Sequence, residues 1–166
     1  IRSVIVSTMQ ALSGAGWTGV PSMAILDNVI PYIRNEEEKV EREALKILGR
    51  YDGERITPAE FKISASCHRV NVLDGHLEAV FVELKSEASP EQVAEVMKNF
   101  KAKPQELRLP TAPENPIIVR EEPDRPQPRL DRNAGGGMSI VVGRIRRDSV
   151  LKNGIKFILL GHNTIR

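Results

Sequence analysis

The stretch FKISASCHRVNVLDGHLEAVFVELK, residues 61–85, decides the fold of the chain. Apolar and polar residues alternate on both sides of an Asp-Gly break, which predicts two strands over residues 60–69 and 76–85. Arg69 ends the first strand and His76 begins the second. A tight two-residue hairpin would keep the two residues about 13 Å apart along the sheet. A wider corner would bring them together, and the pattern alone leaves both arrangements open.

Four further stretches have the composition of strands. Residues 2–9 predict a buried strand, NPIIVR a short edge strand within a proline-rich segment, and the last two stretches an antiparallel pair. These stretches are residues 2–9, 115–120 (NPIIVR), 138–147 (MSIVVGRIRR) and 152–162 (KNGIKFILLGH).

Two segments have the signature of helices. EEEKVEREALKILG, residues 36–49, combines apolar residues at helical spacing with acidic residues in the first turn and a glycine at the end. SPEQVAEVMKNF, residues 89–100, opens with Ser, Pro and Gln in the positions of a capping box. AILDNVIPYI, residues 24–33, is ambiguous and predicts a short helix that Pro31 disrupts or ends.

The order of these elements indicates the fold class. Five or six strands and two helices that do not strictly alternate predict an α+β fold, with a mixed, largely antiparallel sheet and helices on one face. The other face of such a sheet needs a partner, either a second subunit or another domain. The chain of 166 residues predicts about one domain. Because it starts without Met and inside a strand, we expect it to be a piece of a longer polypeptide.

Composition excludes several classes of partner. The net charge of +2 indicates no polyanionic partner, and 4% aromatic residues provide no stacking platform for nucleic acid. No apolar run is long enough to span a membrane. A single cysteine cannot form an internal disulfide, which favours a reducing cytoplasm.

Two short motifs are candidates for ligand binding. Ser13 and Gly14 follow the first predicted strand and let backbone N–H groups approach a small ligand, although the pattern alone favours a flexible turn. Glu36 and Lys39 lie one turn apart at the start of a helix. They form either a solvated charged face or, together with the helix N-terminus, an anion site.

The cysteine and the remaining histidines allow fewer interpretations. Cys67 alternates with apolar residues on one face of a strand, which predicts a small buried residue and not a nucleophile, and His68 then points to the opposite face. His162 and Asn163 end the last strand. Histidines scattered in this way predict no metal site.

Five segments spread over nearly the whole chain form a specific combination. They are STMQALSGAGWTGVPS (7–22), EEEKVEREALKIL (36–48), SASCHRVNVLDGHLEAVFVELK (64–85), GGMSIVVGRIR (136–146) and HNTIR (162–166). Together they resemble the catalytic, dimer-forming domain of the aspartate-β-semialdehyde dehydrogenase family, of the archaeal and fungal type. The resemblance implies the fold of a glyceraldehyde-3-phosphate-dehydrogenase-like C-terminal domain and a cytoplasmic homodimer or homotetramer.

The family's reaction is implied as well. It reductively dephosphorylates aspartyl phosphate to the semialdehyde with NADPH, on the route to lysine, threonine and methionine. In the family a cysteine attacks the acyl phosphate, phosphate leaves, and hydride reduces the thioester. The resemblance implies that NADP is held mainly by a separate dinucleotide-binding domain, which this chain lacks.

The resemblance also implies a role for each matching site residue. Arg69 resembles the family's substrate-carboxylate clamp and His76 its general acid/base. Glu36 resembles the partner of the substrate amino group and Lys39 the phosphate ligand. The matching loop, Ser13 and Gly14, resembles the one that closes over substrate and nicotinamide, and Asn163 is a weaker match to a contact with the nicotinamide amide.

The chain departs from the family in one respect. The Asn-Cys-Ser/Thr nucleophile motif and the glycine-rich nucleotide loop are absent from these residues, and Cys67 does not replace the former. The chain alone is therefore expected to be inactive. Two alternatives stay open, an archaeal malonyl-CoA reductase on the same scaffold and, for the isolated fragment, a non-catalytic oligomerisation domain.

Overall fold

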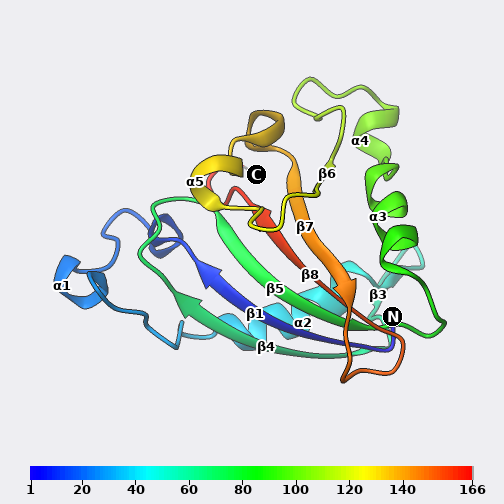
Figure 1. The fold of residues 1–166 in the computed structure, drawn as a ribbon, viewed down its shortest axis with the longest axis horizontal. Coiled ribbons are helices and arrows are strands. Elements are labelled where there is room, and N and C mark those ends of the chain that lie inside the picture. Colours follow the sequence, from blue (N-terminus) through cyan, green and yellow to red (C-terminus); the bar gives the residue numbers. More distant parts are fainter. Residues whose placement is uncertain (166) are drawn as a thin grey trace.

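The computed structural model describes residues 1–165, and its centre is a twisted six-stranded sheet in the order β4-β1-β5-β8-β7-β6 (Figure 1). Its strands are β1 (Ser3–Gln10), β4 (Lys62–Arg69), β5 (His76–Glu83), β6 (Ile117–Arg120), β7 (Ile140–Arg147) and β8 (Gly154–Gly161). A separate small hairpin pairs β2 (Arg50–Tyr51) with β3 (Ile56–Thr57).

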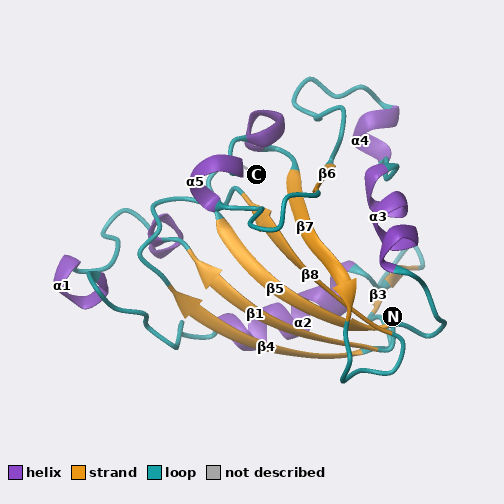
Figure 2. Ribbon diagram, in the orientation of Figure 1, coloured by secondary structure: helices purple, strands orange, loops and turns teal. Residues whose placement is uncertain are grey.

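One long helix lies behind the sheet, and the shorter helices lie at its ends and edges (Figure 2). They are η1 (Leu12–Ala15), α1 (Ser22–Ile25), α2 (Glu36–Ile47), α3 (Pro90–Lys98), α4 (Lys103–Glu106), α5 (Pro128–Asp131) and η2 (Ala134–Gly137). The longest, α2, packs against β4 on the far side of the sheet in Figure 1, and α3 packs against β6 and β7 at the other end. Among residues 1–165, no helix has both the length and the apolar character that crossing a membrane requires.

The sheet is mixed, as predicted. β1–β5, β5–β8 and β7–β8 are antiparallel, whereas β1–β4 and β6–β7 are parallel. The α+β fold class, the antiparallel neighbours β7 and β8 and the edge strand β6 are therefore confirmed.

Local signals placed the long elements within a few residues. The predicted capping box is present at α3, where Ser89 Oγ accepts the Gln92 N–H at 3.2 Å and Gln92 Oε1 accepts the Ser89 N–H at 2.8 Å. The ambiguous stretch 24–33 behaves differently, because the short helix α1 ends at Ile25. Its end coincides with a left-handed residue, Asp27, and not with the later proline.

The strand order corrects one alternative for residues 60–85. β4 and β5 are not paired in a hairpin, because β1 lies between them. This arrangement sets the core: Val6 of β1 lies beside Ala65 of β4 and Val80 of β5, and all three are buried in one cluster. Val40 of α2 packs against the same cluster. The connection between β4 and β5 therefore crosses the end of β1, where the polar residues of interest lie.

Candidate active site

Three adjacent strands end in polar residues at one edge of the sheet. Gln10 of β1 lies directly beside Arg69 of β4, and the neighbouring pair Met9–Leu77 places Gln10 next to His76 of β5. By the alternation of strands, all three side chains are on the face that carries the core cluster. Arg69 and His76 are therefore separated by two strand spacings, about 9–10 Å of backbone. Their long side chains can converge across that gap.

Ala11, immediately after β1, holds both side chains. Arg69 Nη1 donates to the Ala11 carbonyl at 2.6 Å, and the Ala11 N–H donates to His76 Nδ1 at 3.1 Å. Ala11 has no exposed surface, so both bonds end at a buried backbone group. Arg69 is itself only 6% exposed. The bond to Ala11 uses one of the five guanidinium donors and leaves the rest of the planar fork for a ligand.

The turn η1 folds over this pair, and Gly14 is the point of closest approach. A Cβ atom at Gly14 would lie 2.8 Å from Arg69 Nη1 and 3.2 Å from His76 Nε2, so a side chain there would displace the Arg69 guanidinium or the His76 ring. The turn is fixed to the β4–β5 connection by the Leu12 N–H, which donates to the Val72 carbonyl at 2.7 Å. Gly14 therefore lets the turn lie close over Arg69 and His76 in their present positions.

Asn163 links the last strand to the same turn. Its Oδ1 accepts the Gly75 N–H at 2.8 Å, and its Nδ2 donates to Ser13 Oγ at 2.8 Å. The side chain thus ties the corner before β5 to η1. Since an amide has two N–H donors and two lone pairs on its oxygen, one of each is left for a ligand.

The first turn of α2 completes the cluster. Glu36 Oε1 lies 3.5 Å from Lys39 Nζ, an ion pair one turn apart. Both charges influence His76, and Glu36 also influences Arg69. The start of α2 therefore lies near enough to the sheet edge for its charges to act on His76, although the two are separated in sequence.

Burial, together with two nearby cations, favours the neutral form of His76. Burial and the neighbouring Arg69 guanidinium lower the pKa of His76 from 6.5 to about 4, and Lys39 acts in the same direction. The Glu36 carboxylate opposes these effects. Because Nδ1 accepts from Ala11, the neutral ring carries its proton on Nε2, the atom that faces η1. Burial also lowers the pKa of Arg69, and Glu36 counteracts this.

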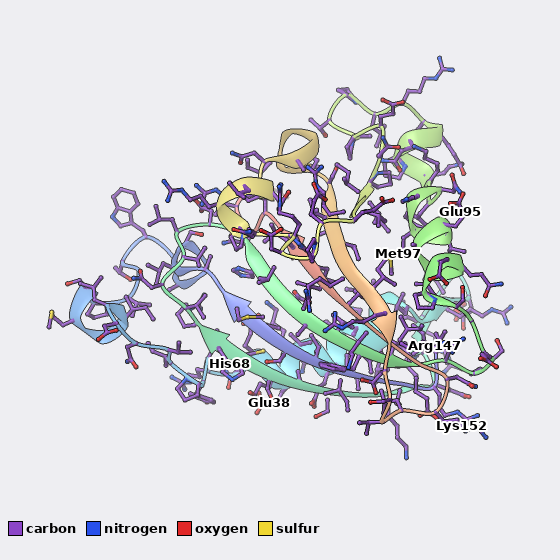
Figure 3. All side chains as sticks on the ribbon, in the orientation of Figure 1. Glu38, His68, Glu95, Met97, Arg147 and Lys152 are labelled. Carbon is purple, nitrogen blue, oxygen red and sulfur yellow. The ribbon has the colours of Figure 1, made fainter. Side chains whose placement is uncertain are left out.

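Cys67 is a structural residue, as predicted. It has no exposed surface, and burial is the main reason that the pKa of its thiol is raised. A buried, protonated thiol is a poor nucleophile. His68 belongs to the opposite face of β4 by strand alternation (Figure 3). Among residues 1–165, no group of three His, Cys, Asp or Glu side chains is arranged to hold a metal ion.

Gln10 is a site residue that the sequence did not indicate. It is 6% exposed and lies between Arg69 and His76. Strand alternation could have indicated it, because Gln10 lies on the same face of β1 as the buried residues Val6 and Thr8. A polar amide therefore continues an inward-facing row of side chains. An inward amide at the end of a strand is costly unless it has a polar partner.

Comparison with known proteins supports a single family. The family described as "Semialdehyde dehydrogenase, dimerisation domain" matches residues 1–166. Aspartate-semialdehyde dehydrogenase of Methanothermobacter thermautotrophicus is 56% identical over 166 residues, which cover 100% of this chain and 48% of the relative. The enzyme of Archaeoglobus fulgidus is 60% identical over 100% of this chain and 47% of its own length. The chain thus spans about half the length of the curated relatives it matches.

Solved structures agree with the sequence relatives. Aspartate semialdehyde dehydrogenase with NADP from Candida albicans superimposes with a TM-score of 0.88 at 41% identity, over 99% of this chain and 46% of that one. Aspartate semialdehyde dehydrogenase II from Vibrio cholerae gives a TM-score of 0.73 at 26% identity, over 98% of this chain and 50% of that one.

Proposed function

Because the chain belongs to the family of semialdehyde dehydrogenase dimerisation domains, we propose that it is the substrate-binding, dimer-forming part of an NADP-dependent aspartate-semialdehyde dehydrogenase. The proposed reaction reduces aspartyl 4-phosphate to aspartate 4-semialdehyde and releases phosphate. The observation that carries the proposal is the cluster of Arg69, His76, Glu36 and Lys39, which are coupled electrostatically at one end of the sheet.

The charges of this cluster match those of the substrate. The Arg69 fork is suited to the substrate α-carboxylate, because a guanidinium binds a carboxylate through two parallel hydrogen bonds. The Glu36 carboxylate can accept from the substrate ammonium group. Lys39, at the helix N-terminus, supplies a point charge for the phosphoryl group. Gln10, between Arg69 and His76, is placed to hydrogen-bond the part of the substrate that lies across β1.

His76 is the proposed catalytic residue, in the acid/base role. Its Nε2 faces the turn η1 and is the atom at which a proton is held or moved. The charge that develops on the substrate carbonyl oxygen needs a hydrogen-bond donor, and Nε2–H is one. The Ala11 N–H fixes the ring orientation, so Nε2 keeps its direction through the reaction.

The described residues fit a small part of a nicotinamide cofactor. NADPH, when bound, supplies the hydride. Ser13 keeps its hydroxyl proton as a donor, because its oxygen only accepts from Asn163. Gly14 keeps the backbone close to the reacting centre, and Asn163 has one N–H left for an amide. We propose that a dinucleotide-binding domain outside residues 1–166 makes the other contacts and supplies the nucleophilic cysteine. The chain by itself is then inactive.

The alternative substrate, malonyl-CoA, is less well matched. It has no ammonium group, and its leaving group is a thiolate. Malonyl-CoA offers no cation to Glu36, so this carboxylate would have no part in binding it. The ion pair of Glu36 and Lys39 therefore favours aspartyl phosphate. Arg69 does not discriminate, since both substrates carry a carboxylate.

Turnover of both substrates with NADPH by the full-length protein tests this choice. We expect faster turnover of aspartyl phosphate, and Glu36→Gln should reduce its kcat/KM by about 10- to 100-fold through loss of a charge-assisted hydrogen bond. Lys39→Ala should raise KM for phosphate in the reverse reaction more than KM for the semialdehyde. The matched control Glu43→Gln, on an exposed position of the same helix, should change neither. Faster turnover of malonyl-CoA would contradict the proposal.

The uncovered face of the sheet is the proposed subunit interface. In Figure 1 no helix crosses the near face of β4, β1 and β5. By alternation that face carries Ile5, Met9, Leu77 and Phe81, which are exposed or half-buried in the single chain. We propose that it packs against the same face of a second copy, in a homodimer or a homotetramer.

Sedimentation of the full-length protein at micromolar concentration checks this interface. Ile5 is 49% exposed, and Ile5→Lys should shift the protein towards monomer because it places a charge in an apolar interface. Val150, which is 87% exposed in the β7–β8 turn, provides the matched control Val150→Lys, and this variant should sediment as the wild type does. A wild-type protein that is strictly monomeric would refute the interface.

A further inference from the structure

The outer edge of β4 is covered by acceptors from outside the sheet. β4 is the last strand on its side, so alternate N–H groups along it have no strand partner. The Cys67 N–H donates to Glu37 Oε1 at 2.9 Å, and the Ala65 N–H donates to Glu41 Oε1 at 2.9 Å. The next outward group, the Arg69 N–H, donates to the Ile30 carbonyl at 2.9 Å. Two of these three acceptors are thus side chains of α2.

The spacing of the two carboxylates fits the strand. Ala65 and Cys67 are two residues apart, which is about 6.6 Å along a strand. Glu37 and Glu41 are four residues apart, which is about 6.0 Å along a helix and on the same face. Each carboxylate can therefore reach one N–H without distortion, in a single register of α2 along β4.

Near the C-terminal end of α2 a backbone bond also holds the helix, since the Ala59 N–H donates to the Leu45 carbonyl at 2.8 Å. Toward its N-terminal end the other contacts are apolar. α2 has no fully buried residue, and Val40 is its contribution to the core cluster. Apolar packing of this kind is not directional. A hydrogen bond from an edge N–H to a carboxylate is directional and charge-assisted. Where α2 begins, its position along the strand is thus specified by Glu37 and Glu41 more than by apolar packing.

The register matters because α2 begins at the active site. Glu36 and Lys39 occupy its first turn, and both influence His76. A shift by one residue moves a helical side chain by about 1.5 Å along the axis and by about 100° around it. Such a shift would turn both charges away from the space above Arg69.

We propose that Glu37 and Glu41 are positioning residues, which fix α2 against the edge of β4 so that Glu36 and Lys39 face the substrate. Neither residue touches the substrate in this arrangement. The carboxylates bind backbone groups of β4, the strand that ends in Arg69. The position of α2 is therefore fixed relative to Arg69. This inference rests on the proposed function for its substrate, but the bonds and their effect on His76 do not depend on it.

The test compares three double variants of the full-length protein. Glu37→Met with Glu41→Met removes both acceptors and preserves side-chain length. Glu37→Gln with Glu41→Gln keeps an oxygen acceptor at the same position. Glu38→Met with Glu43→Met removes the same two charges from exposed positions of α2 (Figure 3 labels Glu38) and is the matched control.

Three readouts are expected to agree. When Glu37→Met and Glu41→Met are combined, KM for phosphate should rise about tenfold with a smaller change in kcat, the NMR titration of His76 should shift, and amide exchange at Ala65 and Cys67 should accelerate. In the other two double variants all three should stay close to the wild type. Exchange that accelerates while KM and the His76 titration are unchanged would show a purely structural role and overturn the proposal. If the wild-type protein does not turn over aspartyl phosphate, the proposed function fails, and the His76 titration still decides this inference.

Discussion

His76→Ala in the full-length protein is expected to lower kcat of the proposed reaction by about 10²–10⁴, the usual contribution of a positioned acid/base group. The side chain is held by the Ala11 N–H at Nδ1, and its Nε2 is directed to the turn η1 beside Arg69. No neighbouring side chain of the cluster replaces a titratable nitrogen at that point. Steady-state kcat with aspartyl phosphate, set against the folded state by circular dichroism, measures the loss.

A second replacement and the pH profile sharpen this result. His76→Asn should be little better than Ala, because its amide does not titrate and does not reach the Nε2 position. The lowered pKa of about 4 keeps the ring neutral at neutral pH. If the neutral ring is the active form, its contribution is present at neutral pH and is lost as the pH falls through about 4. Near-full kcat in His76→Asn would contradict the acid/base role of His76. A loss of activity below a pH of about 6.5 that His76→Asn abolishes would contradict the lowered pKa of this residue.

Local elements were predictable because their signals lie within a few residues. The capping box at Ser89 needs residues 89–92 alone, and the helix from Glu36 follows from charges and apolar residues over a few turns. Strand alternation also predicted correctly that Cys67 is buried. Such signals depend on backbone geometry that each segment adopts largely by itself.

Strand order was not predictable, because it depends on pairings between distant segments. The two strands around the Asp-Gly break are adjacent in sequence, yet β1 lies between them. Nothing in residues 61–85 indicates that insertion. Because of this insertion, the connection between β4 and β5 crosses the end of β1. Arg69 and His76 lie on either side of β1, and Ala11 at its end binds both.

The charged residues of α2 show the same difference between local signals and contacts of distant segments. Glu36 and Lys39 were recognisable as one turn of a helix, whereas their proximity to His76 required the packing of α2 on β4. Glu37 and Glu41 appear in the sequence as part of a charged helix face. Only the sheet edge shows that they cap backbone N–H groups. A charge pattern fixes a helix face, but not the partner that this face meets.

Arg69→Lys should lower kcat/KM for the semialdehyde by about 10²–10³. Loss of one partner from a buried, hydrogen-bonded charge pair costs about 2–5 kcal/mol, and each ~1.36 kcal/mol is a factor of ten. Arg69 is buried and donates to the Ala11 carbonyl while the rest of its fork faces the site. A lysine keeps the charge but has a single nitrogen, which cannot serve the Ala11 carbonyl and both oxygens of a carboxylate.

Comparison of two aldehydes shows whether Arg69→Lys loses activity because the contact with the substrate α-carboxylate is lost. The semialdehyde carries the α-carboxylate, and 3-aminopropanal is the same aldehyde without it. If Arg69 is the clamp, Arg69→Lys should reduce kcat/KM strongly for the first and only slightly for the second. The charge-removing variant Arg69→Gln should also raise the pKa of His76 towards 6.5, because the Arg69 guanidinium is a main cause of its depression after burial. Equal losses for both aldehydes would mean that Arg69 acts by holding Ala11 and His76, and not by binding the substrate carboxylate.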